Sequence, residues 1–297
     1  MDVSIVILNY NTFDLTGQCL ESVVKYTRDV SYEIILVDNA SIECSPDKFL
    51  DKFPQLKLVK SPVNTGFTGG NNLGLEKAEG DYILLMNSDV ILTENSILKC
   101  VNELKKDNTI GVVTCKLLYP NGGIQNQCQR FPSILRTWVE LLRIHKLMPE
   151  KIRARIMLNG FFDHLSNMDS DSVWGTFFMF PAKLLSQFPN KRLPEAFFMY
   201  AEDLLWCYLI KKNGHRVYYL ADTSVIHYSK GSSSVPDANL RQNNEFDFVA
   251  KYYGKLYARI FALSKGLLFT SHIGNKTSKE IAGIYFTLFR RGKTSSR

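Results

Sequence analysis

The amino-terminal part of the chain alternates short apolar runs with segments in which apolar residues recur at helical spacing. The apolar runs hold few polar positions, which is typical of strands buried on both faces of a sheet. The predicted strands cover residues 3–8, 33–37, 56–60, 82–89 and 112–119. The predicted helices cover residues 15–26, 45–53 and 94–106, and a further helix ends near residue 77. Strands alternating with helices predict an α/β fold with a parallel sheet and right-handed crossovers.

The pattern is less regular after the Pro-Asn-Gly-Gly turn at residues 120–123. The elements expected there are a basic helix (138–148), a polar, mobile stretch (166–172), a buried strand (173–180), a helix (203–212) and two short strands (217–220 and 225–228). Gly214 follows the predicted helix and is a residue type that often ends one.

The tail differs from the rest, because its apolar residues form two helical stripes that basic residues flank. The first stripe is Leu256, Ile260, Leu263 and Leu267, and the second is Ile281, Ile284, Tyr285, Leu288 and Phe289. Basic amphipathic helices are typical of an interfacial membrane anchor. Ordinary packing of surface helices explains the stripes equally well. We therefore expect a domain at residues 1–240 and a helical extension at 241–297, with both explanations open.

Composition and the start of the sequence indicate the compartment of the protein and whether it spans a membrane. The chain has 297 residues, of which 45% are hydrophobic, and a formal net charge of +7. The six cysteines form no CxxC pair and no metal-ligand spacing, so reduced structural thiols in a cytosolic protein are expected. The first predicted strand begins within two residues of the start, so a signal peptide is not expected. No apolar run approaches the roughly 20 residues that a membrane span needs.

Two carboxylates follow directly on predicted strands. Asp38 ends the run 33–37, and Asp89 ends the run 82–86 after Asn87 and Ser88. Ligands of open α/β sheets bind outside the carboxyl ends of the strands, so both acids are expected at one crevice. Asp38 suits a nucleoside contact, and Asp89 suits Mg²⁺ or Mn²⁺ on a diphosphate. The alternatives are a turn residue for Asp38 and a helix cap for Asp89.

Glu202 and Asp203 form a third acidic position, after the aromatic run Phe197, Phe198 and Tyr200. Transfer of a group to a hydroxyl requires a base near that hydroxyl, and a carboxylate here would supply it. A structural cap is the alternative, because a helix start favours a negative charge without any function. The aromatic run is either a wall of a sugar site or core.

Three further features are weaker signals. The segment from Gly66 to Gly74 is expected to be a loop that leads into a helix, and its glycines do not match a dinucleotide or P-loop fingerprint. The glycines would let the backbone approach a nucleotide that Asn71 contacts, but a tight loop before a helix explains them equally well. His227 is a candidate metal ligand or a structural strand histidine. Trp174 and Gly175 form either the floor of an acceptor pocket or part of the core.

The order of these segments resembles family 2 glycosyltransferases, and most closely the bacterial rhamnosyltransferase-like branch. The segments that carry the resemblance are VSIVILNYN, ILVDNAS, NTGFTGGNNLG, YILLMNSDV, GTFFMF, FFMYAEDLLWC and VIHYSKGSS, in this order over residues 3–235. The resemblance implies the GT-A fold, with a mostly parallel central sheet flanked by helices. It also implies a nucleotide-diphosphate sugar donor, a divalent metal and inversion at the anomeric carbon.

The resemblance assigns roles to residues of this chain. The implied donor-binding residues are Asn9, Asn11, Asp38, Asn39, Gly66, Asn71 and Asp89. Asp203 matches the general base with Glu202 beside it, Asp89 and His227 match metal-side positions, and the implied acceptor-binding residues are Trp174, Gly175 and Tyr200. Two positions depart from the family pattern. Asn87 replaces the first acid of Asp-x-Asp, and Leu205 replaces a further acid after the Glu-Asp pair.

The expected function is inverting transfer of a sugar, with dTDP-rhamnose or a UDP-sugar as donor and a lipid-linked saccharide as acceptor. The expected location is the cytoplasmic face of the cell membrane, with peripheral contact through the carboxy-terminal helices. A nucleotidyltransferase is the first rival, although the segment after the first strand lacks the glycines and positive charge for a triphosphate. A non-catalytic nucleotide-sugar-binding protein is the second. Nucleic acid is not an expected partner, because the basic residues form no recognisable module.

Overall fold

The computed structural model describes residues 1–229, 238–271 and 275–293, and the chain divides into two compact units. The first unit consists of Met1–Gln129, Asp163–Phe198 and Glu202–Ser234. The second consists of Arg130–Phe162, Met199–Ala201 and Val235–Arg297. The second unit thus contains an internal segment, 130–162, that the hydrophobic pattern did not separate from the first.

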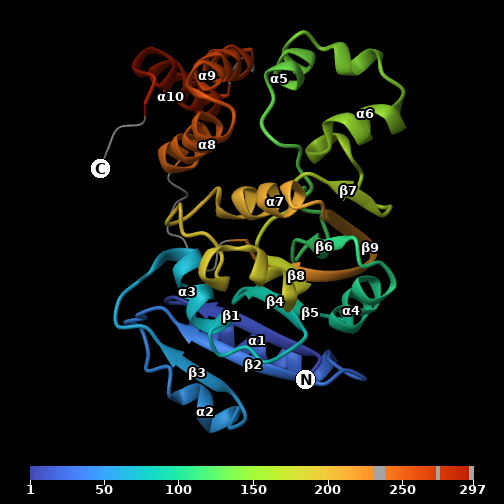
Figure 1. Cartoon of the computed structure of the whole chain (residues 1–297), viewed down its shortest axis with the longest axis vertical. Coiled ribbons are helices and arrows are strands. Elements are labelled where there is room, and N and C mark those ends of the chain that lie inside the picture. Colours follow the sequence, from blue (N-terminus) through green and yellow to red (C-terminus); the bar gives the residue numbers. More distant parts are fainter. Residues whose placement is uncertain (230–237, 272–274, 294–297) are drawn as a thin grey trace. The chain divides into compact units, whose positions relative to one another are not determined.

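A nine-stranded sheet forms the centre of the first unit in the described part of the chain (Figure 1). Its strands are β1 (Val3–Asn9), β2 (Tyr32–Asp38), β3 (Lys57–Lys60), β4 (Tyr82–Asn87), β5 (Val90–Leu92), β6 (Ile110–Leu118), β7 (Met168–Ser170), β8 (Phe177–Pro181) and β9 (Arg216–His227). The order across the sheet is β3-β2-β1-β4-β8-β6-β9-β5, and β7 also pairs with β9.

The sheet is parallel at its amino-terminal end and mixed beyond it. Strands β3, β2, β1 and β4 run parallel, as the alternation of strands and helices predicts. Strand β8 is antiparallel to β4 and β6, while β6 and β9 are parallel to each other. Strands β5 and β7 are antiparallel to β9. The expected α/β class with a central sheet flanked by helices is confirmed, and the parallel pairs are concentrated in the first four strands.

Helices cover both faces of this sheet. The helices of the first unit are α1 (Phe13–Tyr26), α2 (Lys48–Lys52), α3 (Gly66–Leu75), α4 (Ser96–Lys106) and α7 (Glu202–Lys212), with short 3₁₀ segments at Ala182–Gln187 and Pro189–Lys191. Side chains alternate across a strand, so Ile5 and Ile7 of β1 join Leu20 of α1 in the main core. The neighbouring Val6 points to the opposite face, where it contacts α3.

The glycine-rich segment expected as a loop is the helix α3, and this expectation is wrong. A Cβ atom on Gly70 would lie 2.4 Å from Leu8 Cδ1, and one on Gly74 would lie 2.4 Å from Val6 Cγ1. These contacts are too close for any side chain, so both glycines let the helix backbone lie directly against β1. Glycine weakens a helix by about 1 kcal/mol relative to alanine, so tertiary packing here overrides local propensity.

Gly66 begins α3 with φ of +74°, and a Cβ atom there would lie 2.4 Å from the Phe198 carbonyl oxygen. That carbonyl accepts a 2.9 Å hydrogen bond from the Phe67 N–H. Gly66→Ala should therefore cost about 1–2 kcal/mol for the left-handed backbone and about 1–3 kcal/mol more for the clash. Gly122→Ala is the matched control, since Gly122 also has positive φ (+84°) but no atom within 4 Å of its Cβ position. Equal losses of unfolding free energy in urea would refute the clash.

Two expectations about the second half of the first unit are also wrong. The stretch 166–172 was expected to be mobile, but it contains β7, whose Asp169 pairs with Arg216 of β9 at 2.7 Å. The two short strands expected at 217–220 and 225–228 are one strand, β9, whose pairing with β6 shifts register between Cys115 and Lys116. The hydrophobic pattern does not predict either feature. Strand β7 contains a polar residue that forms an ion pair, and the shift of register in β9 interrupts the alternation of apolar and polar residues.

The second unit is helical in its described residues. Its helices are α5 (Ile134–Leu141), α6 (Glu150–Met157), α8 (Ala238–Tyr252), α9 (Lys255–Thr270) and α10 (Lys276–Arg291), with short 3₁₀ segments at Ile144–Leu147 and Asn159–Phe161. The helix predicted for 138–148 ends at Leu141 because Arg143 adopts a left-handed conformation with φ of +57°. Helix α5 also contacts α9, because the Trp138 indole N–H donates to Ser264 Oγ at 3.0 Å.

The two carboxy-terminal apolar stripes differ in burial. In α10, Tyr285 and Leu288 are buried, and Tyr285 stacks on Phe269 of α9 with ring centroids 5.9 Å apart. This stripe is part of the core of the second unit. In α9, by contrast, Leu256 and Ile260 remain exposed. No helix in the described part of the chain is long and apolar enough to cross a membrane.

The cysteines are free thiols, as expected. Burial raises the pKa of the Cys19, Cys100 and Cys207 thiols well above the usual range. Such thiols stay protonated and unreactive, which is typical of structural cysteines.

Candidate active site

The carboxyl ends of three parallel strands lie together at one edge of the sheet. Asn9 at the end of β1 pairs with Asp38 of β2, and Leu8 pairs with Asn87 of β4. Neighbouring strands are about 4.8 Å apart, so Asp38 and Asn87 flank the end of β1 at about that spacing. Asp89 follows Asn87 by two residues, in the turn before β5. The register therefore brings the first two predicted acids to the same edge.

Asn9 holds the Asp38 carboxylate in place. The Asn9 Nδ2 group donates to Asp38 Oδ1 at 2.8 Å and to Ser41 Oγ at 3.0 Å. The other carboxylate oxygen, Oδ2, accepts the Ser41 N–H at 3.2 Å. Because both Asn9 and Asp38 are buried, these bonds fix the orientation of the carboxylate.

The same asparagine connects the Asp38 side of the edge to the Asp89 side. Asn9 Oδ1 accepts hydrogen bonds from the hydroxyls of Thr12 (3.0 Å) and Thr16 (2.8 Å). Thr12 in turn shares a 2.9 Å hydrogen bond with the hydroxyl of Ser88, the residue before Asp89. A continuous buried polar path thus links the ends of β2, β1 and β4.

Asn11 and Asn39, two predicted donor-side residues, hold loops at this edge. Asn11 has φ of +53°, and its Oδ1 accepts the Ile42 N–H at 2.9 Å. Asn39 Nδ2 donates to Asn64 Oδ1 (2.9 Å) and to the Gly66 carbonyl (3.2 Å). Asn39 therefore connects the end of β2 to the start of α3. Both residues shape the edge through these contacts.

Asn71 lies inside the packing of α3. Its Nδ2 group donates to the Phe67 carbonyl at 2.8 Å, and its side chain is buried. The neighbouring Asn72 holds the segment after the 3₁₀ turns, since it donates to the Leu193 carbonyl (2.9 Å) and accepts the Leu193 N–H (3.0 Å). The described contacts of these two asparagines are thus with the protein itself.

Asp89 faces His227 across the pair β5–β9. The distance from Asp89 Oδ1 to His227 Nε2 is 3.4 Å, and both side chains are buried. The opposite ring nitrogen, Nδ1, lies 2.7 Å from Gln125 Oε1, and the Gln125 amide N–H donates to the His227 carbonyl at 2.7 Å. This second bond orients the amide so that Oε1 accepts from Nδ1–H. In the neutral form of the imidazole, the proton is then on Nδ1 and the Nε2 lone pair faces Asp89.

The donor atoms at this point fit a divalent cation that substrate phosphates also bind. Asp89 Oδ1 and His227 Nε2 face each other, and the buried Asn87 Oδ1 has no hydrogen-bond partner among the described residues. Mg²⁺ commonly takes one or two protein carboxylates and completes its coordination with phosphate and water. A cluster of three or more His, Cys, Asp or Glu ligands is absent from the residues that the structure describes. Such a cation would therefore need the diphosphate to complete its coordination.

Gln125→Leu tests the role of the hydrogen bond to His227. Without an acceptor for Nδ1–H, the imidazole should lose its single tautomer, which ¹⁵N NMR of the metal-free protein would show directly. Partners that orient a metal ligand typically contribute 10–100-fold in affinity, so Mn²⁺ binding with a nucleoside diphosphate should weaken by roughly that factor. Gln127→Leu is the matched control, because Gln127 is equally buried but contacts Thr114 and Cys115 instead. An unchanged tautomer in Gln125→Leu would overturn this assignment.

Asp203 connects to the same edge through the start of β8. Its Oδ2 accepts the Gly175 N–H at 3.4 Å, and its Oδ1 accepts the Leu204 N–H at 2.7 Å. The residue after Gly175 is Thr176, whose carbonyl accepts the Asn87 N–H at 3.0 Å. Two hydrogen bonds, one to Gly175 and one to Thr176, thus connect Asp203 at the start of α7 with the end of β4. Its carboxylate also lies where a helix terminus stabilises negative charge.

Aromatic side chains surround this approach to Asp203. A Cβ atom on Gly175 would lie 2.9 Å from the Phe67 ring, which stacks on Trp206 at 6.0 Å between centroids. Gly175 is therefore packed against aromatic rings, and a larger residue would displace Phe67. Trp174 Nε1 is buried without a hydrogen-bond partner among the described residues, so it is a donor that a ligand could use. Glu202 is buried beside Asp203.

Tyr200 belongs to the second unit and is described there. Its carbonyl accepts a 3.1 Å hydrogen bond from Asn244 Nδ2 of α8, and the Arg241 guanidinium lies 5.9 Å from the centre of its ring. Tyr200 and Ala201 have φ of +67° and +70°, an unusual conformation for two successive residues other than glycine. The structure therefore does not place Tyr200 relative to Trp174 and Gly175.

Several residues of the edge escaped the sequence prediction. Thr12, Ser41 and Ser88 form the hydrogen bonds between strand ends, and Gln125 orients His227. The three hydroxyl residues lie within four residues of a predicted strand end, which is a signal that could have found them. Gln125 follows a turn and lies 102 positions from His227, so no local pattern indicates it.

Comparison with known proteins assigns the chain to a family. The sequence profile "Glycosyl transferase family 2" matches residues 4–167. The chain therefore belongs to glycosyl transferase family 2, and the resemblance to this family is confirmed. The rhamnosyl branch is not distinguished by this match.

Curated relatives match the chain over part of their length. Poly(ribitol-phosphate) beta-glucosyltransferase of Bacillus spizizenii is 35% identical over 127 residues, which is 41% of this chain and 20% of that protein. Chondroitin synthase of Pasteurella multocida is 26% identical over 171 residues, which is 56% of this chain and 18% of that protein. The chain thus spans about a fifth of the length of each of these relatives.

Solved structures share the fold. S. aureus TarS 1-349 superposes with a TM-score of 0.54 at 16% identity. The match covers 98% of this chain and 89% of the TarS chain. The mannosyltransferase PcManGT from Pyrobaculum calidifontis, in complex with GDP-Man and Mn²⁺, gives 0.56 at 16% identity, with 98% of this chain and 84% of that chain covered. These neighbours are GT-A glycosyltransferases, so the expected GT-A fold is confirmed.

Proposed function

We propose that this chain is an inverting glycosyltransferase that moves a sugar from a nucleotide-diphosphate donor to a hydroxyl of a saccharide acceptor. The observation that carries the proposal is the chain of contacts at the sheet edge. It leads from Asp38 through Asn9 and Thr12 to Ser88, and from Asn87 through Thr176 and Gly175 to Asp203. Family membership supports the same conclusion.

The residues divide the reaction among them. Asp38 orients the nucleoside, and Asp203 takes the proton of the acceptor hydroxyl. That oxygen forms a bond to the anomeric carbon from the face opposite the diphosphate, while the bond to the diphosphate oxygen breaks and its electron pair leaves with the diphosphate. Glu202 is the second carboxylate beside the base. Trp174 and Gly175 contact the acceptor saccharide.

Asp89 and His227 are the residues that would hold Mg²⁺ or Mn²⁺. The bound cation supplies charge stabilisation to the leaving diphosphate. Gln125 keeps the His227 Nε2 lone pair directed to that position. Mn²⁺ in the PcManGT complex, named with GDP-Man, supports a divalent metal in this fold.

For the donor, we propose dTDP-rhamnose first and a UDP-sugar second. The motif resemblance to the rhamnosyltransferase-like branch supports the former. The name of the Bacillus relative, a glucosyltransferase, and the UDP complex of TarS support the latter. The acceptor we propose is a lipid-linked saccharide of cell-surface polysaccharide synthesis, since one relative is named as an O-antigen biosynthesis protein.

A donor screen with product analysis tests the proposal. Each nucleotide sugar is added to the full chain with and without Mn²⁺, and thermal unfolding is measured. A true donor should raise the melting temperature, and more so with the metal. Turnover should release a nucleoside diphosphate. Release of pyrophosphate would indicate a nucleotidyltransferase, and binding without turnover over a broad acceptor panel would indicate a non-catalytic protein.

We further propose peripheral contact with the inner face of the cell membrane through the second unit. That unit has 18 Lys and Arg against 6 Asp and Glu, whereas the first unit has 18 against 23. The positive charge of the chain is therefore concentrated in one unit, where Leu256 and Ile260 of α9 are exposed. Basic surfaces with exposed apolar residues are typical of binding to anionic lipids.

A further inference from the structure

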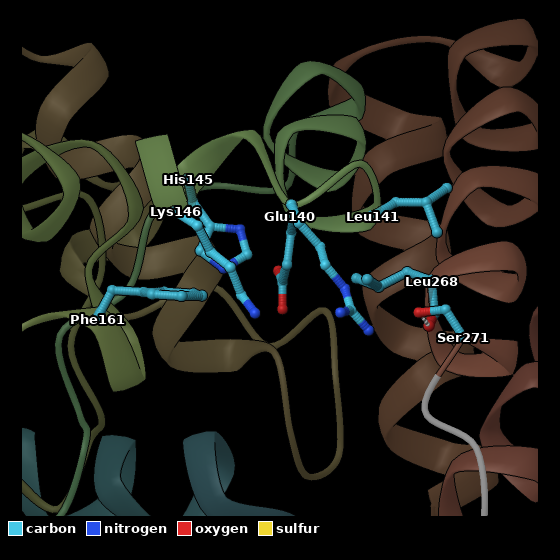
Figure 2. A pocket seen from close by; sticks show the side chains of 8 residues that line it. Glu140, Leu141, His145, Lys146, Phe161, Leu268 and Ser271 are labelled. Carbon is cyan, nitrogen blue, oxygen red and sulfur yellow. Dashed lines mark hydrogen bonds between the residues drawn. The ribbon is translucent and has the colours of Figure 1, made fainter. Parts of the chain in front are cut away.

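The second unit contains a pocket of about 300 Å³ that none of the proposed catalytic residues touches. Its lining residues come from the end of α5 and the turn after it, from the 3₁₀ segment Asn159–Phe161, and from the end of α9 with the residue that follows it. They are Glu140, Leu141, Arg143, His145, Lys146, Phe161, Leu268 and Ser271. Figure 2 shows the side chains of His145, Lys146 and Glu140 directed into the space between Phe161 on one side and Leu268 with Ser271 on the other.

The pocket offers several donors to an anion. Arg143 and Lys146 supply cationic N–H donors, and the Ser271 hydroxyl, which donates to the Leu268 carbonyl at 2.7 Å, lies at the opposite wall. His145 packs on Phe161 with ring centroids 4.9 Å apart, and its buried Nδ1 has no hydrogen-bond partner among the described residues. Arginine and lysine together are a common recognition set for phosphate oxygens. The Glu140 carboxylate opposes a bare anion but would accept a hydrogen bond from a hydroxyl beside it.

The same turn presents apolar side chains to solvent. Leu142 and Leu147 are 60% and 86% exposed, and Ile144 between them is 40% exposed. In sequence these residues alternate with the pocket residues Arg143, His145 and Lys146. Arg143 has a left-handed backbone conformation, and the 3₁₀ turn Ile144–Leu147 follows it. Exposed apolar residues adjacent in sequence to the basic residues of a pocket suit the boundary between lipid headgroups and acyl chains.

We propose that this pocket binds the phosphodiester headgroup of an anionic, hydroxyl-bearing membrane lipid, of the phosphatidylglycerol class. Arg143 and Lys146 contact the phosphate, Glu140 accepts from a headgroup hydroxyl, and Leu142, Ile144 and Leu147 insert among the acyl chains. The inference rests on the proposed membrane contact and assigns it to a defined site. The charged residues of that site lie in segment 140–147, outside the carboxy-terminal extension that the sequence singled out, and the extension contributes Leu268 and Ser271.

Vesicle binding by the full chain tests this proposal. Phosphatidylcholine vesicles with phosphatidylglycerol are compared with vesicles that carry the same surface charge as oleate. The account expects at least about tenfold tighter binding to the phosphatidylglycerol vesicles, because Arg143 and Lys146 form charge-assisted contacts with the phosphodiester and Glu140 accepts from its headgroup hydroxyl. The attraction to the negative surface potential is the same for both vesicle types. Equal binding to both vesicle types would overturn it. Saturation of the pocket by millimolar glycerol 1-phosphate without vesicles would assign it to a soluble phosphate ester instead.

Variants distinguish binding at this pocket from non-specific electrostatic attraction to the vesicle. Arg143→Ala with Lys146→Ala removes two charges in the pocket, and Lys276→Ala with Lys279→Ala removes two exposed charges on α10. Ser271→Tyr obstructs the pocket without changing any charge, and Thr277→Tyr is its control. We expect a tenfold or larger loss for both pocket variants and less than threefold for the controls. A Ser271→Tyr protein that keeps full binding would refute the site.

Donor binding is measured in the same variants, because it should be unchanged. A loss of vesicle binding with intact nucleotide-sugar binding would support the lipid site. If no nucleotide sugar binds the wild-type chain, the proposed transferase function fails while the vesicle comparison still decides the lipid site.

Discussion

Asp203→Asn is expected to reduce sugar transfer by about 10²–10⁴-fold, the usual contribution of a general base. The amide oxygen can still accept the Gly175 N–H, so the fold and the position of the side chain should be kept. Binding of the nucleotide sugar should therefore stay within about twofold of wild type, which corresponds to about 0.4 kcal/mol. Single-turnover transfer and calorimetric donor binding measure the two effects separately.

Glu202→Gln is the matched comparison for this prediction. Glu202 is the adjacent carboxylate, but it is buried, whereas Asp203 is partly exposed. We expect a smaller loss of transfer in Glu202→Gln than in Asp203→Asn. A larger loss in Glu202→Gln, or near-normal turnover in Asp203→Asn, would remove Asp203 as the base.

Asp89→Asn should have the second large effect, at the metal side. The substitution keeps the shape of the side chain but removes the charge that faces His227 Nε2. Because a bound cation contributes several kcal/mol of charge stabilisation, transfer should fall by about 100-fold or more. Mn²⁺ affinity in the presence of nucleoside diphosphate should fall in parallel, and electron paramagnetic resonance of free Mn²⁺ measures it without turnover.

Asp81→Asn is the control for that substitution. Asp81 precedes the same strand, β4, at its opposite end, and its side chain is exposed. It should change neither Mn²⁺ affinity nor transfer. If Asp89→Asn behaves like Asp81→Asn, the acid at the carboxyl end of β4 has no part in metal binding. A cap of α4 does not explain Asp89 either, because Asn95 is the N-cap of that helix and its side chain accepts the Leu98 N–H.

Much of the parallel part of the fold could be predicted from the sequence, because each buried strand is a continuous apolar run. The ends of these runs also indicated Asp38 and Asp89, since the carboxyl ends of parallel strands share one edge. The positions of the acids relative to one another follow from strand order. That order places β1 between β2 and β4, and hydrophobic pattern alone does not specify it.

Other features depend on contacts between distant segments and could not be predicted locally. Gly70 and Gly74 indicated a loop by composition, but they form a helix because β1 lies against them. The role of Gln125, which lies outside the strands, depends on His227 of β9, 102 positions away. The helical second unit joins segments 130–162 and 235–297, and the two stretches carry no shared sequence signal.

The central claim is that the ends of β1, β2 and β4 and the start of β8 form one donor site. Hydrogen–deuterium exchange of the full chain, with and without a nucleotide sugar and Mn²⁺, tests it most directly. The account predicts that one donor slows exchange together in residues 10–12, 39–42, 88–90 and 174–176. Protection that is confined to a single one of these segments, or that lies elsewhere in the chain under saturating donor, would contradict it.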